Sequence, residues 1–166
     1  LKLGPGPYQA KIVTRDKNSG RLGSLTHDFE VPALTGLRVS SLVLSDRLRE
    51  EAKGGGPEIV ARRRFAPAGT LHCRFEVYGA ARDPATGEPR VTAGFAVRRA
   101  DGRVLVAAPE TAIRPGPGGS LSRSLGFPLD GVPPGSYEVI VLVTDLVAGG
   151  VAEAREPIVV EGTPGS

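Results

Sequence analysis

Two stretches of this sequence are built alike and decide the fold to expect: PGPYQAKIVTRDKNSGRLGSLTHDFEVPALTG (residues 5–36) and PGSYEVIVLVTDLVAGGVAEAREPIVVEGTPG (residues 134–165). They align without a gap, and apolar positions coincide along their length, such as Ile12 with Val141 and Phe29 with Ile158. An internal repeat of this kind indicates two segments of common architecture. Identical pairs include Pro5 and Pro134, Gly6 and Gly135, Tyr8 and Tyr137, Asp16 and Asp145, Gly20 and Gly149, and Gly36 and Gly165.

Each copy predicts a β-hairpin. A Pro-Gly turn leads into a run in which alternate residues are apolar, which is typical of a strand. In the second copy this run covers residues 137–144, a connection follows at 145–150, and residues 151–160 return. In the first copy the equivalent strands are expected at residues 8–16 and 22–31.

The start of each copy also carries a recognisable structural motif. Gly6 and Tyr8, like Gly135 and Tyr137, stand in a Pro-Gly-x-Tyr run. Such a run is typical of the tyrosine corner of immunoglobulin-like sandwiches, in which the Tyr hydroxyl bonds back to nearby backbone. We therefore assign all four residues structural roles.

The repeat predicts an all-β chain with two modules. Residues 1–33 are expected to be the C-terminal, closing hairpin of a preceding, incomplete β-sandwich. Residues 36–161 are expected to be a complete immunoglobulin-like antiparallel β-sandwich that ends in its own hairpin. Because an isolated hairpin is marginal in water, the first hairpin should dock against another chain, which makes an oligomer possible, or another segment of the parent protein. Packing onto the 36–161 module is the second choice.

Between the hairpins the sequence alternates in short runs that predict further strands. Asp101–Gly102 between two apolar runs is a strong hairpin signal. Ser45 is a candidate N-cap for a helix of two turns over residues 45–53. Residues 111–119 are expected to be irregular. Strands are expected at 36–44, 71–78, 91–97, 103–107 and 121–129. The expected core consists of Leu71, Cys73, Phe75, Val77, Leu125, Val139 and Val141.

Composition excludes several classes of protein. No run approaches 18 apolar residues, so no membrane-spanning helix is expected. A single cysteine, Cys73, excludes an internal disulfide. The formal net charge is +3 and the basic residues are scattered, which argues against a nucleic-acid partner.

Residues that could carry chemistry are few. His72 and Cys73 are neighbours on a predicted strand, so their side chains should point to opposite faces. His27 shares the parity of Leu25 and Phe29, which suggests a half-buried histidine rather than a ligand. Asp16 to Gly20 lacks the EF-hand spacing, because Arg21 and His27 occupy the sixth and twelfth positions. We expect no catalytic residue, no metal and no cofactor.

Two surface features remain as candidates for interaction. Arg62, Arg63 and Arg64 form the most basic run, whose charges can discourage edge pairing or contact a partner. Tyr78 is the one tyrosine outside the two corners and could serve as a glycan platform.

Several runs resemble the C-terminal part of bacterial von Willebrand factor A-related (VWFA-related) proteins. They are residues 6–16, 19–24, 29–32, 37–44, 63–65, 85–89, 99–102, 134–137 and 143–145. The resemblance implies an exported (periplasmic, cell-surface or extracellular), multidomain protein whose β-rich tail follows an A domain. The A domain's D-x-S-x-S metal motif is absent from this sequence. We therefore expect a non-catalytic module for protein–protein interaction or structural spacing, with an accessory glycan-binding module as the alternative.

Overall fold

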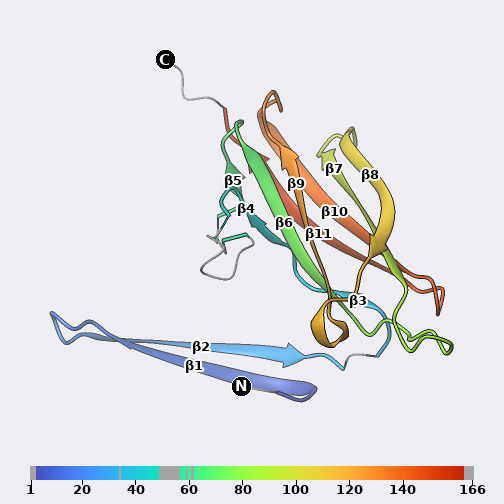
Figure 1. The fold of residues 1–166 in the computed structure, drawn as a ribbon. Coiled ribbons are helices and arrows are strands. Elements are labelled where there is room, and N and C mark those ends of the chain that lie inside the picture. The colour runs from blue at the N-terminus through green and yellow to red at the C-terminus, as the bar shows by residue number, and fades with distance from the viewer. Residues whose placement is uncertain (1–2, 34, 49–56, 59, 61, 163–166) are drawn as a thin grey trace. The chain divides into compact units, whose positions relative to one another are not determined.

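The chain divides into two compact units, Leu1–Thr35 and Gly36–Ser166. The computed structural model describes residues 3–33, 35–48, 57–58, 60 and 62–162 (Figure 1). Within these residues the regular structure consists of β-strands and one short 3-10 turn, η2 (Pro117–Gly119). The expected all-β class is confirmed.

The first unit is an antiparallel hairpin. Strand β1 (Gly6–Arg15) pairs with β2 (Leu22–Val31) from Gly6 opposite Val31 to Arg15 opposite Leu22. The two strands agree closely with those predicted at 8–16 and 22–31. Asp16 begins the connecting turn: its backbone N–H donates to the Arg21 carbonyl at 2.9 Å.

The second unit is a β-sandwich of two sheets. One sheet has the order β5-β11-β10-β7-β8, and in the other β6 pairs with β3, β4 and β9. Figure 1 shows β6 and β9 in one layer and β7, β8, β10 and β11 in the other. The strands are β3 (Arg38–Val39), β4 (Val43–Ser45), β5 (Arg64–Phe65), β6 (Thr70–Tyr78), β7 (Val91–Arg99), β8 (Val104–Ile113), β9 (Leu121–Pro128), β10 (Gly135–Asp145) and β11 (Val151–Val160).

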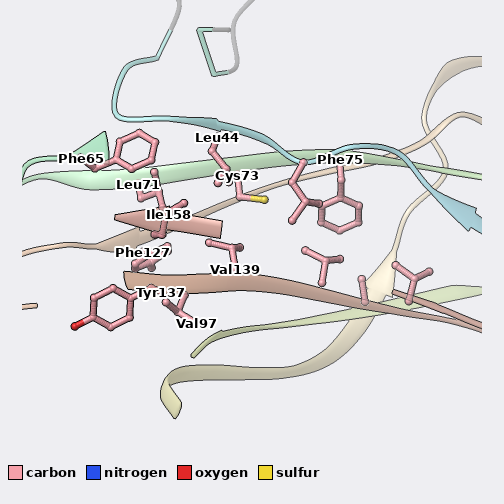
Figure 2. Packing of buried hydrophobic residues seen from close by; sticks show 14 of the residues in the cluster. Leu44, Phe65, Leu71, Cys73, Phe75, Val97, Phe127, Tyr137, Val139 and Ile158 are labelled. Carbon is pink, nitrogen blue, oxygen red and sulfur yellow. The ribbon is translucent and has the colours of Figure 1, made fainter. Parts of the chain in front are cut away.

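The core lies between the two sheets. On β6 the side chains of Leu71, Cys73, Phe75 and Val77 are buried, and Phe75 is only 1% exposed. They face buried residues of β10, including Val139 (Figure 2). The predicted register is therefore correct. Leu125 is half-buried and packs against this cluster.

The strand expected at residues 36–44 is divided in two. Arg38 pairs with Tyr78, whereas Val43 pairs with Arg74, so the register slips by one residue between β3 and β4. At the slip the Ser40 hydroxyl accepts the N–H of Glu76 at 3.0 Å. A side-chain acceptor here replaces the ladder bond, as at a β-bulge.

The helix expected at 45–53 does not begin where Ser45 predicted it. Ser45 pairs with His72 as the last residue of β4, and Leu48 forms an isolated bridge to Pro57. The Ser45 hydroxyl does accept the N–H of Arg47 at 3.0 Å, as a cap would, but it does so in a turn. Sheet pairing overrides the local signal. The rest of the expected helix, residues 49–53, lies outside the described residues.

The segment 111–119 was expected to be irregular, and its first part is not. Strand β8 continues to Ile113, which pairs with Val91 and is buried. The extension is held by Arg123, whose Nη1 donates to the carbonyls of Ala93 and Thr111. A guanidinium from β9 thus bridges β7 and β8, a contact between segments distant in sequence.

Candidate functional site

The Pro-Gly-x-Tyr motif forms the same corner twice. The Tyr137 hydroxyl donates to the Pro133 carbonyl at 2.7 Å, and the Tyr8 hydroxyl donates to the Gly4 carbonyl at 2.9 Å. Gly135 has φ 153° and Gly6 has φ 145°, values that favour glycine. In both copies the hydroxyl bonds to backbone four residues earlier, as a tyrosine corner does.

The turns of the two hairpins are also of the same type. Asp145 Oδ1 accepts the N–H groups of Val147 and Ala148 at 2.8 and 3.1 Å. Asp16 Oδ1 accepts those of Asn18 and Ser19 at 2.7 and 3.3 Å. In each turn a glycine, Gly149 or Gly20, takes a left-handed conformation, with φ 71° or 70°. The hairpins therefore coincide in corner, turn and strand register.

Asp145 has an additional contact that ties its turn to another part of the sandwich. Its Oδ2 accepts the N–H of Ala81 at 2.7 Å, and the residue is 1% exposed. Burial acts to raise the pKa of this carboxyl, but the hydrogen bonds from Ala81, Val147 and Ala148 outweigh burial and hold the pKa below its usual value. The described contacts of Asp145 are those of a structural carboxylate.

The shared register sorts the residues of the first hairpin onto two faces. The apolar hairpin face is made of Tyr8, Ala10, Ile12, Leu25, Phe29 and Val31, with His27 among them. On it the Tyr8 and Phe29 rings stack with centroids 5.8 Å apart. The opposite face carries mainly polar residues, including Gln9, which donates to Asp28 at 2.8 Å. Val13 and Leu22 lie on that polar face.

His27 lies on the face that its parity predicted, opposite Ala10, but its side chain is exposed rather than half-buried. Its ring stacks on Phe29, with centroids 6.2 Å apart and planes 12° apart. The contact is aromatic, and it extends the apolar surface by one ring.

The arginine run is partly engaged by the module itself. Arg62 pairs with Asp46, and Arg63 Nε lies 2.5 Å from Glu156 Oε1 on β11. Arg64 is exposed on β5, whose backbone pairs in parallel with Val159. The structure therefore uses Arg63 to hold the edge strand β5 against β11. Arg62 and Arg64 both remain exposed.

Tyr78 borders a hollow of about 290 Å³ at one end of the sandwich. Its side chain is 40% exposed, and its hydroxyl donates to Glu76 Oε2. That hydrogen bond raises the pKa of Tyr78. Arg82, whose Nη1 donates to the Gly87 carbonyl at 2.8 Å, also lines the hollow, as do Gly118 to Ser120. Sequence reasoning singled out Tyr78 but did not group it with Glu76 or Arg82. Glu76 lies two residues earlier on the same face of β6, whereas Arg82 and Gly118 to Ser120 reach the hollow from other segments.

The side chains of Cys73 and His72 point to opposite faces of β6. Cys73 is buried in the core and His72 is half-buried on the other face of β6. Burial, together with the charge of Glu156, raises the pKa of the Cys73 thiol to about 12. The thiol is therefore protonated at neutral pH and packs as a small apolar group.

Metal-binding clusters and membrane-spanning helices are both absent from the described part of the chain. Its residues include no group of three or more His, Cys, Asp or Glu side chains placed to hold a metal ion. In the same ranges no helix has the length and apolar character needed to cross a membrane.

Comparison with known proteins gives distant structural likeness only. No protein-family model and no curated protein matches the chain. A protein named "putative beta-galactosidase", from Bacteroides fragilis, aligns with TM-score 0.45 and 12% identity over 73% of this chain. A superoxide reductase (neelaredoxin) from Ignicoccus hospitalis aligns with TM-score 0.43 and 15% identity over 74%. A family 123 glycoside hydrolase from Clostridium perfringens aligns with TM-score 0.45 and 13% identity over 78%.

These alignments cover unequal shares of the other proteins. They span 17% of the β-galactosidase, 82% of the superoxide reductase and 28% of the glycoside hydrolase. At such scores they carry no argument about activity. The fold assignment rests on the sheet order and the core described above.

Proposed function

We propose that this chain is a non-catalytic β-sandwich segment of a larger exported protein, in which it serves protein–protein contact or spacing between modules. One observation carries the proposal: two hairpins with the same corner, turn and register occur 129 residues apart, at Tyr8 and Tyr137. Duplicated modules in one chain are typical of proteins built from structural repeats. Residues 36–161 then form one complete module, and residues 1–33 belong to another.

The chemistry of the described side chains supports a structural role. The Cys73 thiol is buried and protonated, and the buried Asp145 carboxylate binds three backbone N–H groups. A nucleophile or general base needs an accessible group with a suitable pKa. Export is proposed on the resemblance to VWFA-related proteins.

One observation favours a second candidate, an accessory glycan-binding module. The exposed Tyr78 borders a hollow that Glu76 and Arg82 also line, and its hydroxyl donates to Glu76. An aromatic ring beside a few polar groups is a common arrangement in ligand sites. The candidate is weaker because the hollow offers a single aromatic ring among its lining residues.

The lysines of this chain allow a direct test of protein contact. Of the four lysines, Lys11 and Lys17 lie on the first hairpin. Lysine-directed cross-linking of the natural gene product, read by mass spectrometry, should join one or both to protein segments outside residues 1–166. If both lysines give links only within residues 1–166, the contact role is contradicted.

A glycan array distinguishes the alternative. The 166-residue chain should show no binding that depends on Tyr78. If the chain binds a glycan, Tyr78→Ala abolishes the binding and Tyr78→Phe retains it, the ring is a glycan platform and the second candidate replaces the first.

A further inference from the structure

We propose that the apolar hairpin face closes a second β-sandwich, whose remaining strands precede the hairpin in the same polypeptide. The occupant of this face is a β-sheet with an apolar inner surface, equivalent to the sheet of β3, β4, β6 and β9. This inference rests on the proposed function, because it assumes modules in tandem. It adds which surface is used and what covers it.

The second unit shows what covers a face of this construction. Ile12 of β1 is equivalent to Val141 of β10, and Leu25 of β2 to Ala154 of β11. Val141 is fully buried against the other sheet, and Ala154 packs against the core. In the first unit Ile12 is 52% exposed and Leu25 is 60% exposed. The same face is thus covered in one copy and open in the other.

The outer edges of the hairpin strands also differ between the two units. In the second unit β10 pairs with β7 in antiparallel fashion, and β11 pairs with β5 in parallel. Within the described residues, β1 and β2 pair only with each other. Unpaired edges invite further strands. Besides the covering sheet, the preceding strands should therefore supply an antiparallel strand beside β1, equivalent to β7, and a parallel strand beside β2, equivalent to β5.

The order of strands in the second unit indicates where the occupant lies. There the hairpin β10–β11 comes after every other strand of its sandwich. A hairpin of the same type should therefore follow the strands that it completes. A second copy of this chain cannot offer an equivalent position without losing its own hairpin, because β10 and β11 already fill it.

Three residues predict how the other sandwich differs in detail. Ala10 and Thr14 stand where β10 has Val139 and Val143. A close-packed core then needs larger side chains opposite these two positions. Pro32 stands where Glu161 donates its N–H to the Phe65 carbonyl. Proline has no N–H, so the parallel pairing beside β2 should be shorter by one bond.

Two neighbouring β-branched positions provide a matched test. Ile12 and Val13 are adjacent on β1 and are similarly exposed in this chain, at 52% and 61%. Their equivalents differ: Val141 is fully buried, whereas Leu142 is 36% exposed on the outer face of the sheet. Only Ile12 should therefore become buried when the sandwich is complete.

The experiment compares Ile12→Asp with Val13→Asp by hydrogen exchange of residues 8–31. In the 166-residue chain the two variants should exchange alike, and faster than residues 137–158. In the natural gene product the parent protein should protect residues 8–31. Ile12→Asp should then accelerate their exchange by about a hundredfold, because it buries a carboxylate without a partner, and Val13→Asp should not. If Ile12→Asp prevents folding, Ile12→Ala and Val13→Ala replace the pair.

Three results would overturn the inference. One is equal exchange of the two variants in the gene product. Another is slow exchange of residues 8–31 in a monomeric 166-residue chain. The third is protection that appears only as that chain dimerises, which would identify a second copy as the occupant. The proposed function fails separately, through the absence of cross-links from Lys11 and Lys17 to outside segments.

Discussion

The backbone N–H of Ala81 donates to Asp145 Oδ2 at 2.7 Å, joining residues that are 64 positions apart. Ala81 follows β6 in one sheet, and Asp145 ends β10 in the other. Through Oδ1 the same carboxylate organises the β10–β11 turn. One buried side chain thus connects the two sheets at the end of the sandwich.

Replacing this carboxylate should destabilise the second unit. Asp145→Asn replaces one carboxylate oxygen with an amide NH₂ at a position where backbone N–H groups converge. We therefore expect the free energy of unfolding to fall by about 2 kcal/mol. Chemical denaturation at neutral pH, followed by circular dichroism, measures it. Asp16→Asn is the matched control, because Asp16 makes the same turn in the first unit. If both variants leave the second unit equally stable, the Ala81 bond does not contribute.

The same group predicts a dependence on pH. The folded-state pKa of Asp145 lies below its ordinary value of 3.8. A depressed pKa contributes stability that is present above the unfolded-state pKa and is lost as the pH falls through the folded-state pKa. The wild-type chain should therefore lose more stability than Asp145→Asn between about pH 5 and pH 2. Thermal unfolding across this range checks it, and parallel curves would contradict it.

Removing the Phe75 ring from the core should destabilise the second unit. Phe75 is almost fully buried, so Phe75→Ala should lower the free energy of unfolding by about 3–5 kcal/mol. Its neighbour Arg74 points to the other face of β6, and Arg74→Ala should cost less than about 0.5 kcal/mol. Denaturant titration of both variants is the measurement. Similar losses for the two would contradict the register.

The two tyrosine corners allow a comparison of equivalent hydroxyls. Tyr137→Phe removes the bond to the Pro133 carbonyl and should cost about 1 kcal/mol without changing any binding. Tyr8→Phe removes the equivalent bond to Gly4 but should leave unfolding of the second unit unchanged. Denaturation of the second unit, followed by hydrogen exchange at residues 135–160, distinguishes them. If Tyr137→Phe leaves the stability of the second unit unchanged, the hydroxyl bond of the corner does not contribute to that stability.

The thiol of Cys73 should be inert in the folded chain. Its pKa is raised to about 12 by burial and by Glu156, and the thiolate is the reactive form. A thiol reagent at pH 8 should therefore label the native chain slowly and the denatured chain at once. Because the sequence has one cysteine, the signal comes from Cys73 alone. Rapid native labelling would contradict the buried placement.

The features that the sequence determined alone are those with a local, repeating signal. Alternation along residues 71–77 placed one side of β6 in the core, because neighbouring side chains on a strand point to opposite faces. The Pro-Gly-x-Tyr run placed both corners, since each hydroxyl reaches backbone only four residues away. The repeat likewise determined both hairpins, whose strands are joined by short turns.

Contacts between distant segments decided the rest. The bulge at Ser40 depends on Glu76, and the extension of β8 to Ile113 depends on Arg123. Ser45 has the local signal of a helix cap, yet pairing with His72 keeps it in a strand. The Ala81–Asp145 bond and the grouping of Tyr78 with Arg82 arise in the same way. None of these leaves a periodic trace in sequence, because each depends on which segments the two sheets bring together.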